Sequence, residues 1–492
     1  MTRRVRPTRL VLMASGTLLV ACPSNGGGGE GEADDGGSSS DTTAESSDTG
    51  ESTGTDTGDS TGQDTSSSEQ GSSNESTGNV GPACGDGIVD EGEECDDDNV
   101  LDGDACTGRC TRPWEQLWSD STNGAGDAAD GLADVVVDAA GNIYVAGFTT
   151  LGTDGPDLWI RALDPAGNEL WAIVEDGGGM LPDGVAALAL HPSGDLLAAG
   201  SVGVVDMERD AWLRRLSSSD GAEVWTEIYA TMDSMDSMDS MDNSWASVAV
   251  DADGNIVVTG AEATMTNGED VIVHKYGPDG GMPVWTASHD GMAHRSDFGS
   301  YVAVDADGNV YVAGAEFVMG MSHDAWLRKY DPDGVEVWTQ THSLLSYSQS
   351  LRGVAVDSMG NPVVAGFEAD LGVGGNVWVR KYDSTGAELW TDIVAGFGSS
   401  DDAGNDVWID SEDAIYIAGA LGRMNQSTNI WLHKYAADGT DVWTWDYNNE
   451  RTNLEDSGSG VAVDADGNVI VVGGETLLGQ GRDAFIAKLA QK

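Results

Sequence analysis

Carboxylate side chains recur at fixed places in a repeating pattern, and they are the residues of this 492-residue chain that could do chemistry. One set follows the second predicted strand of the repeat in four copies: Glu262, Glu316, Glu368 and Glu475. The other set precedes the third predicted strand, as Asp157, Asp210, Asp270, Asp324 and Asp483, with Asn376 and Asn429 in the remaining copies. Carboxylate oxygens suit hard cations and basic partners, so we predict both sets as ligand or cation candidates. Loop capping is the alternative for the aspartate and asparagine set.

No pattern in the sequence indicates catalysis. The seven histidines are scattered, and His274 and His433 stand where other repeats carry Arg328 and Arg380. The chain lacks the His-Glu-x-x-His spacing of a zinc enzyme. We therefore assign no catalytic residue and predict a non-catalytic protein. Because carboxylates are plentiful, a hydrolase that uses a carboxylate pair is the alternative.

The repeat that positions these residues is best seen between Ser300 and Thr341. Runs of alternating Val, Tyr, Trp and Leu are separated by Asp-Gly turns, which is typical of strands joined by hairpins. The turn after the first strand begins at Asp138, His191, Asp251, Asp305, Asp357, Asp410 and Asp464. Seven copies of four strands at intervals of 52 to 60 residues predict an all-β fold, a seven-bladed β-propeller with four-stranded blades.

Two resemblances agree with this fold. The segment VAVDADGNVYVAGAE, Val302–Glu316, and its six counterparts resemble the seven-bladed β-propeller repeat family. The segment DSTGAELW, Asp383–Trp390, is distantly similar to the tryptophan-docked repeats of pyrroloquinoline quinone enzymes. Those enzymes carry an adjacent pair of cysteines, which this chain lacks. The second resemblance therefore implies the fold but not the quinone cofactor.

Two further repeated features have a structural and a functional interpretation. Turns such as Asp305-Ala-Asp307-Gly-Asn309 look like Ca²⁺ loops, but the middle acid varies between repeats and Asp-x-x-Gly is ordinary turn chemistry. Tryptophans recur at one position of the fourth strand: Trp171, Trp225, Trp285, Trp338, Trp390 and Trp443. This strand is the outermost of its blade, far from any central channel, so we predict packing between blades rather than a ligand platform.

The last repeat lacks its fourth strand, and a spare copy lies upstream at Glu115–Ser119. We predict that Trp118 belongs to the outermost strand of the last blade, so that the two chain ends close the ring and leave no open edge. The turns between strands one and two, and three and four, then lie on one side, the uniform face. The loops between strands two and three and the blade links lie on the other, the variable face, where binding is expected. The closing strand enters from the uniform face, so the variable face should point away from a membrane.

The first 82 residues indicate export and a tether. Residues 1–21 have a basic start and an apolar stretch too short to cross a bilayer, as in a signal peptide. The stretch Leu19–Cys22 resembles a lipobox, which implies cleavage before Cys22 and its lipidation. Pro23 rather than Asp follows, which favours the outer membrane. Residues 22–82, the lipid-bearing cysteine and a Ser/Thr/Gly/Asp linker, have almost no apolar side chains, so we predict that they are disordered.

Residues 83–112 form a predicted cysteine-rich module. Ala83–Cys110, with its Cys-Gly-Asp-Gly opening, resembles the myxobacterial cysteine-rich repeat. The resemblance implies a small surface module stapled by disulfides among Cys84, Cys95, Cys106 and Cys110, with three pairings open. The acids Asp96, Asp98, Asp102 and Asp104 could hold Ca²⁺ as a cofactor. The alternative is that they only solvate a module that has no core.

The chain carries 84 acidic and 23 basic residues, a formal charge of −61. This field repels nucleic acid and anionic lipid, which excludes both as partners except for a membrane reached through the lipid anchor. With a propeller over residues 113–492, we expect a lipoprotein of the cell envelope, at the outer membrane and facing the cell surface. Its propeller would bind an unidentified protein, glycan or cation, or act as a scaffold. The alternatives are a quinone-dependent or hydrolytic propeller enzyme and an outer-membrane assembly scaffold.

Overall fold

A computed structural model describes most of the predicted propeller and little of what precedes it. The described residues are 94–95, 111–124, 128–151, 155–177, 181–204, 208–230, 242–264, 268–318, 322–344, 347–370, 374–397, 401–424, 427–448, 454–479 and 481–492. Cys22, three of the module cysteines (Cys84, Cys106 and Cys110) and the Ca²⁺ candidates Asp96, Asp98, Asp102 and Asp104 lie outside them. Cys95 is disulfide-bonded, while the pairing of the four cysteines stays a prediction. Among the described residues, no helix has the length and hydropathy needed to span a membrane.

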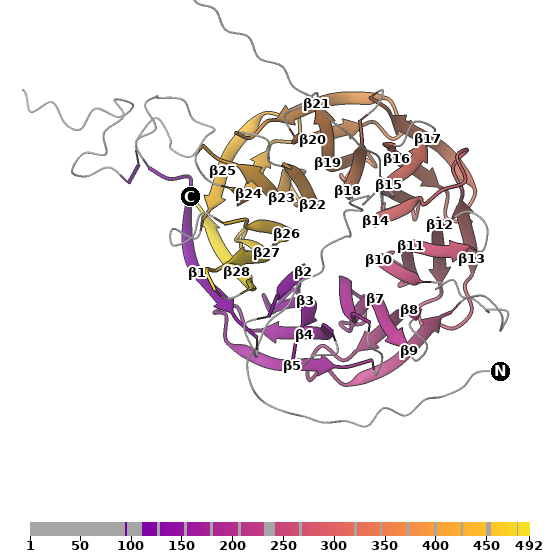
Figure 1. The fold of residues 1–492 in the computed structure, drawn as a ribbon, viewed down its shortest axis with the longest axis horizontal. Coiled ribbons are helices and arrows are strands. Elements are labelled where there is room, and N and C mark those ends of the chain that lie inside the picture. The colour runs from indigo at the N-terminus through magenta and orange to yellow at the C-terminus, as the bar shows by residue number, and fades with distance from the viewer. Residues whose placement is uncertain are drawn as a thin grey trace, which may run out of the picture. The chain divides into compact units, whose positions relative to one another are not determined.

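Seven four-stranded antiparallel sheets, here blades I to VII, are arranged as a ring (Figure 1). Blade I contains β2 (Gly131–Val137), β3 (Ile143–Thr149), β4 (Asp157–Leu163) and β5 (Glu169–Glu175), and blade II contains β6 (Gly184–Leu190), β7 (Leu196–Val204), β8 (Glu208–Leu216) and β9 (Glu223–Tyr229). Blade III contains β10 (Asn243–Val250), β11 (Ile256–Thr264), β12 (Gly268–Tyr276) and β13 (Trp285–His289), and blade IV contains β14 (Phe298–Val304), β15 (Val310–Val318), β16 (Ser322–Tyr330) and β17 (Glu336–His342).

Blade V contains β18 (Gln349–Val356), β19 (Pro362–Asp370), β20 (Gly374–Tyr382) and β21 (Glu388–Val394), and blade VI contains β22 (Ala403–Ile409), β23 (Ile415–Gly422), β24 (Thr428–Tyr435) and β25 (Asp441–Tyr447). Blade VII contains β26 (Ser457–Val463), β27 (Val469–Thr476), β28 (Arg482–Gln491) and β1 (Trp114–Thr122). In every blade the first strand in this order lies nearest the ring's centre (Figure 1). The predicted fold is confirmed.

The uniform turns are built by their first aspartate. In the turn after β14, Asp305 Oδ1 accepts the backbone N–H groups of Asp307 (3.0 Å) and Asn309 (2.9 Å). Gly308 closes the turn at a φ of +81°, which an L side chain rarely adopts. The same Asx turn follows the inner strand in every blade except II, where His191 replaces the aspartate and its Nδ1 accepts the N–H of Ser193 (3.1 Å).

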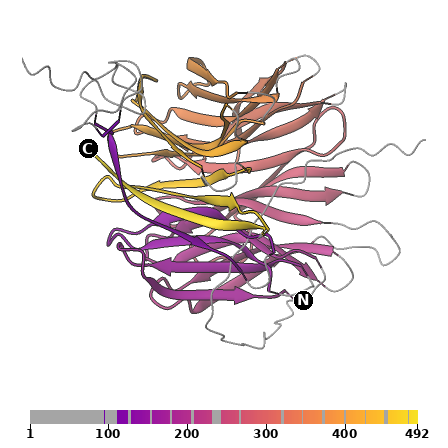
Figure 2. The ribbon, with the colours of Figure 1, turned by 60° about the vertical axis from the view of Figure 1, so that its left-hand side comes forward.

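Closure by the N-terminal strand is confirmed. β1 pairs with β28 in antiparallel register from Trp114 opposite Gln491 to Thr122 opposite Ala484, and Figure 2 shows the two strands side by side. Because Trp114 lies opposite the end of the chain, β1 enters the ring at the uniform face, as predicted. Trp114 also packs edge-on against Trp445 of blade VI, with ring centroids 6.3 Å apart.

The repeated tryptophans pack between blades, as predicted. Each ring lies on the glycine of the next blade's turn between its third and fourth strands. The pairs are Trp118 with Gly167, Trp171 with Gly221, Trp225 with Gly280, Trp285 with Gly334, Trp338 with Gly386 and Trp390 with Gly439. At Gly334 an added Cβ would lie 2.7 Å from the Trp285 ring, so only glycine permits this approach. Trp443 is buried in the cluster between blades VI and VII.

Trp118→Ala should lower the free energy of unfolding by about 2–3 kcal/mol, because the half-buried ring loses its packing on Gly167 and its Nε1–H bond to the carbonyl of Pro165 (3.4 Å). Chemical denaturation measures the change. The control is Leu117→Ala, since Leu117 is 48% exposed on the same strand and its removal should cost little. An unchanged midpoint for Trp118→Ala would contradict the role of β1 in closing the ring.

Candidate functional site

The two predicted acidic sets meet in the structure as direct cross-strand partners. Glu262 lies opposite Asp270, Glu316 opposite Asp324, Glu368 opposite Asn376 and Glu475 opposite Asp483. In the other blades Thr149 faces Asp157, Val202 faces Asp210 and Leu421 faces Asn429. Opposite residues of an antiparallel pair share one side of the sheet. The four blades with a glutamate therefore present both positions together, at the end of the sheet that carries the variable loops.

All four glutamates are held by the blade before them. The hydroxyl groups of Tyr229 and Tyr447 donate to Glu262 (2.7 Å) and Glu475 (2.8 Å). In the same way His289 Nε2 lies 2.8 Å from Glu316, and His342 Nε2 lies 3.2 Å from Glu368. The four partners occupy one position of the outermost strand. Blades I, II and VI lack the glutamate, and the blades that precede them have Thr122, Glu175 and Val394 at the partner position. The glutamate and its aromatic donor thus occur together, which assigns these four glutamates to the joints between blades.

The neighbours of His289 fix its tautomer. Arg328 Nη2 lies 3.3 Å from His289 Nδ1, and a guanidinium can only donate, so Nδ1 is the acceptor. The proton of the neutral ring is therefore on Nε2, where it donates to Glu316. Arg328 also lies over the ring of Trp326. One strand-three tryptophan, one arginine and one histidine are packed together at this joint.

Two of the strand-three aspartates belong to three-carboxylate clusters. Asp157 joins Asp176 and Asp183 between blades I and II, and Asp270 joins Asp290 and Asp297 between blades III and IV. Within each cluster one carboxylate oxygen from each residue lies within 4.8 Å of the others. The clusters occupy equivalent places: strand three, the residue after the outermost strand, and the residue before the next inner strand. Burial, followed by the charges of Asp290, Asp297 and Glu262, raises the pKa of Asp270 to about 6.

The sequence interpretation missed one buried polar position that occurs at every joint. It holds Asp130, Asp183, Asn243, Asp297, Gln349, Asp402 and Asp456, all 3% exposed or less. The best-formed example is Asp402, which accepts the N–H of Gly396 in the blade link and of Gly422 at the end of β23, both at 2.7 Å. The side chain thus fastens the incoming link to its own blade. The sequence does contain a signal for this position. In each repeat the residue stands eight positions before the first residue of the uniform turn.

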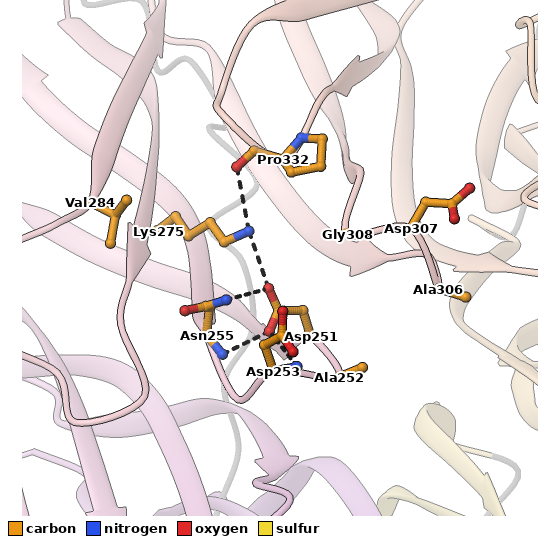
Figure 3. A pocket seen from close by; sticks show the side chains of 10 residues that line it. All are labelled: Asp251, Ala252, Asp253, Asn255, Lys275, Val284, Ala306, Asp307, Gly308 and Pro332. Carbon is orange, nitrogen blue, oxygen red and sulfur yellow. Dashed lines mark hydrogen bonds and ion pairs between the residues drawn. The ribbon is translucent and has the colours of Figure 1, made fainter.

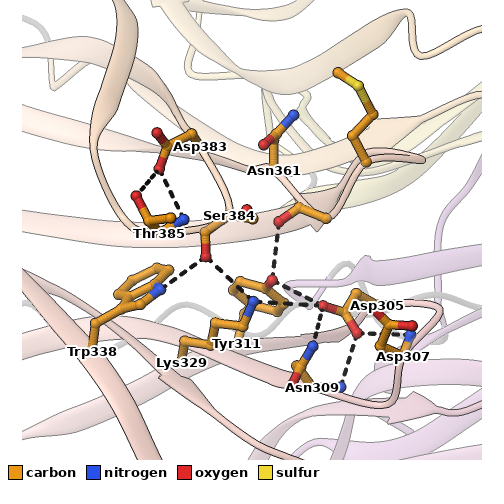
Figure 4. A network of polar contacts seen from close by, with 12 residues as sticks. Asp305, Asp307, Asn309, Tyr311, Lys329, Trp338, Asn361, Asp383, Ser384 and Thr385 are labelled. Atoms are coloured by element: carbon orange, nitrogen blue, oxygen red, sulfur yellow. Dashed lines mark hydrogen bonds and ion pairs between the residues drawn. The ribbon is translucent and has the colours of Figure 1, made fainter.

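At the uniform face, buried lysines pair with the turn aspartate of their own blade and donate to a carbonyl of the next blade. Lys275 lies 3.1 Å from Asp251 and donates to the carbonyl of Pro332 in the next blade (3.5 Å; Figure 3). The next joint repeats this with Lys329, Asp305 and the carbonyl of Ser384, to which Trp338 also donates (Figure 4). The oxygens of these turn aspartates are thus used by backbone N–H groups and a lysine. This arrangement favours the turn interpretation over a Ca²⁺ loop.

A hollow of about 300 Å³ lies at the uniform face between blades III and IV (Figure 3). Its lining includes Asp253, Asp307, Lys275 and Pro332. Val257 holds the position that Tyr311 takes one blade further, where the phenol lies 3.0 Å from both Asp305 and the carbonyl of Gly360. At the next joint a phenol therefore stands where this joint has a valine. We do not assign the hollow a ligand.

Comparison with known proteins adds the fold alone. No protein-family model matches the chain, and no curated protein matches it. Similar solved structures include a protein of unknown function from Bacteroides caccae, 12% identical over 61% of this chain and 94% of that chain, with a TM-score of 0.38. A protein of unknown function from Dyadobacter fermentans is 11% identical over 63% of this chain and 95% of that chain, with a TM-score of 0.44. The quinohemoprotein alcohol dehydrogenase ADHIIG from Pseudomonas putida is 9% identical over 77% of this chain and 76% of that chain, with a TM-score of 0.43. At these values none of the three supports a function, and what is established for this chain is that it is a seven-bladed β-propeller.

Tyr447→Phe should destabilise the fold by about 1–3 kcal/mol, because it removes the hydroxyl that donates to Glu475, a side chain only 2% exposed. Urea denaturation of Tyr447→Phe, Glu475→Gln and the double variant gives the coupling between the two side chains. Additive losses would contradict the assignment of this pair to the joint.

Asp270→Asn should flatten the pH profile of stability. The folded pKa of Asp270, about 6, is raised above the unfolded value of 3.8, so its charged form is disfavoured by folding and stability is lost as pH rises through about 6. Asparagine occupies this position in blades V and VI, so it should fit. We expect the variant to gain on the order of 1–2 kcal/mol over the wild type between pH 4 and 7, after a discount for solvent screening. Thermal midpoints measured across this pH range test the prediction, and Asp253→Asn on the exposed uniform turn is the control. If the midpoints of Asp270→Asn and the wild type change in parallel with pH, the pKa of Asp270 is not raised by folding.

Proposed function

We propose that this protein is a lipoprotein of the cell envelope whose propeller is a non-catalytic binding module for a positively charged protein surface. Supporting this is the way the chain uses its few basic residues. Lys275, Lys381 and Lys488 are buried beside turn aspartates. Others lie over strand-three tryptophans: Arg161, Arg214, Arg328 and Arg380. With these seven cations enclosed at the joints and a formal charge of −61, the molecule presents an excess of carboxylates to its surroundings.

Topology favours the variable face as the binding side. The uniform turns have their first aspartates bonded internally and differ little between blades. On the variable side the acids differ from joint to joint, with exposed Asp176 and Asp290 at two of the seven. A negative potential there would speed the approach of a basic partner and make its binding sensitive to salt.

The tether follows from the resemblance of Leu19–Cys22 to a lipobox and from the entry of β1 at the uniform face. A linker of about 60 residues with this polar composition would span roughly 45 Å, enough to hold the propeller clear of a membrane surface. The variable face would then be directed outward. Labelling of cells with a palmitate analogue should mark the wild type and not Cys22→Ser.

Binding is tested with the full-length protein and a lysine-rich peptide as the probe. Calorimetric titration should show binding that weakens strongly between about 0.05 M and 0.5 M salt, because added ions screen exposed charges. The variant Asp176→Asn/Asp290→Asn on the variable face should bind several-fold more weakly. The matched control is Asp253→Asn/Asp307→Asn on the uniform face, which removes the same charge. Equal losses in both variants would show nonspecific attraction and contradict the proposal.

Crosslinking on intact cells followed by mass spectrometry tests the physiological partner. Crosslinks from the blade ends that carry the variable loops to a basic protein of the envelope are expected. Turnover of a hydrolase substrate, or of an alcohol after soaking with the quinone, would replace the binding role by an enzymatic one.

A further inference from the structure

One position of the inner strands differs in chemistry from blade to blade. It follows the bulge in each inner strand and lies four residues before the turn. It holds Asp134, Ala187, Ser247, Tyr301, Gly353, Asp406 and Gly460. The rest of this strand repeats closely, as in the Val-Ala-Val-Asp stretches that end at Asp251, Asp305, Asp357 and Asp464. Two blades thus place an aspartate where the others have small, hydroxyl-bearing or aromatic residues.

Both aspartates are buried and both connect neighbouring blades. Asp134 is 7% exposed, and its Oδ2 accepts the N–H of Leu188 in blade II at 2.7 Å. Asp406 is 2% exposed, and its Oδ2 accepts the N–H of Val461 in blade VII at 2.8 Å. Ser247 makes the equivalent contact with Val302 in blade IV at 3.2 Å. A hydroxyl is therefore enough to make this link, and the link itself does not require a carboxylate.

The two carboxyl groups share one neighbourhood on the inner ring. Blade VII lies between their blades and contributes Gly460, where an added Cβ would lie 3.2 Å from Asp134 Cα. The residue after Gly460 is Val461, whose N–H binds Asp406. The Tyr301 phenol hydrogen-bonds Asp406 and feels the charge of both aspartates. Gly460 therefore lies against Asp134, and its neighbour Val461 lies against Asp406.

No described cation neutralises the pair. Arg352 precedes Gly353, the residue of blade V at this position. Its guanidinium donates to Asn405 Oδ1 at 2.8 Å and lies over the ring of Phe367. The equivalent positions of the remaining blades hold Ala187, Ser247, Gly353 and Gly460, none of which titrates. Two buried like charges without a counter-ion are strongly unfavourable. Burial and then the charge of Asp406 raise the pKa of Asp134 to about 8, and burial also raises the pKa of Asp406.

We propose that Asp134 and Asp406 form a proton-binding pair on the inner ring, and that loss of the shared proton destabilises the joints between blades I and II and between blades VI and VII. At neutral pH one carboxyl group keeps its proton, so the pair carries a single negative charge. Ionisation adds a second charge in the same buried place. The pKa of the pair is higher in the folded than in the unfolded protein. The pair therefore favours folding at low pH, and this contribution to stability is lost as pH rises through the folded pKa.

The test uses the full-length protein and a variant that copies the chain's own Ser247 into both positions. Asp134→Ser/Asp406→Ser keeps an acceptor for the neighbouring N–H groups but has nothing to titrate. Infrared spectra of the wild type at pH 7 should contain the carbonyl stretch of an un-ionised carboxylic acid, which fades as pH rises through about 8. The wild type minus variant difference should retain that band. The thermal midpoint of the wild type should fall by several degrees between about pH 6 and pH 9, and that of the variant by clearly less.

The single variants Asp134→Ser and Asp406→Ser supply the same readouts if the double variant does not fold. In each the band should fade at a lower pH than in the wild type, because one like charge is removed while burial remains. Ser247→Ala is the matched control, since it removes an inter-blade link without a titrating group and should lower the midpoint equally at every pH. Identical infrared spectra of wild type and variants at pH 7 would overturn the proposal. So would a fall in the wild-type midpoint on adding EDTA at pH 7 that the variants do not show, because a metal ion would then occupy the place of the proton.

Discussion

The joint between neighbouring blades is the contact on which the whole molecule depends. A single four-stranded sheet leaves both of its sides apolar, so each blade is stable only where it packs on the next. The chain secures most joints at several levels, from the buried lysine and turn aspartate at the uniform face, through the tryptophan on glycine, to the buried acid or amide that fastens the blade link. Blade I has Ala162 in place of the lysine, and blade II has Arg215, which pairs with Asp195. In blade VI Lys434 donates to Gln491 of blade VII at 2.6 Å, and Trp443 is buried in the cluster between the two blades.

The seventh joint shows why closure uses both chain ends. Blade VII has three strands from the C-terminus, and β1 supplies the fourth, so the ring cannot form until residues more than 350 apart are paired. β1 brings a tryptophan for each neighbour: Trp114 contacts blade VI and Trp118 contacts blade I. Glu94, just upstream, accepts from Lys492 Nζ at 2.8 Å. The segment that leads into β1 is therefore held to the C-terminal residue, and β1 also contacts both flanking blades.

The sequence was sufficient for the fold because each signal is local. Period, Asp-Gly turns and strand alternation lie within single repeats, and the missing fourth strand of the last repeat pointed to Trp118. The candidate site was harder, because its contacts cross from one blade to the next. Nothing near Glu316 in the sequence indicates that His289, in the preceding repeat, would bind it. The fastening acids before each inner strand could have been found from their constant spacing to the turn. The pair Asp134 and Asp406 could not, because the bulge before each of them shifts the strand alternation that would place their side chains.

Residues that differ between equivalent positions of the seven blades are the ones that can indicate function. Where an acid has a partner that changes with it, as Glu475 does with Tyr447, the pair is explained by packing and says nothing about ligands. Other acids vary in type from joint to joint, and Asp290 contacts His294, four residues further on, at 2.7 Å. Asp176 and Asp290 stand where other blades have Ala230, Ser343, Ala395, Asn448 and Asn123, and the fold is made equally well with those residues. Added like charge repels the compact state, so the two aspartates agree with the proposed role of the variable face as a negatively charged binding surface.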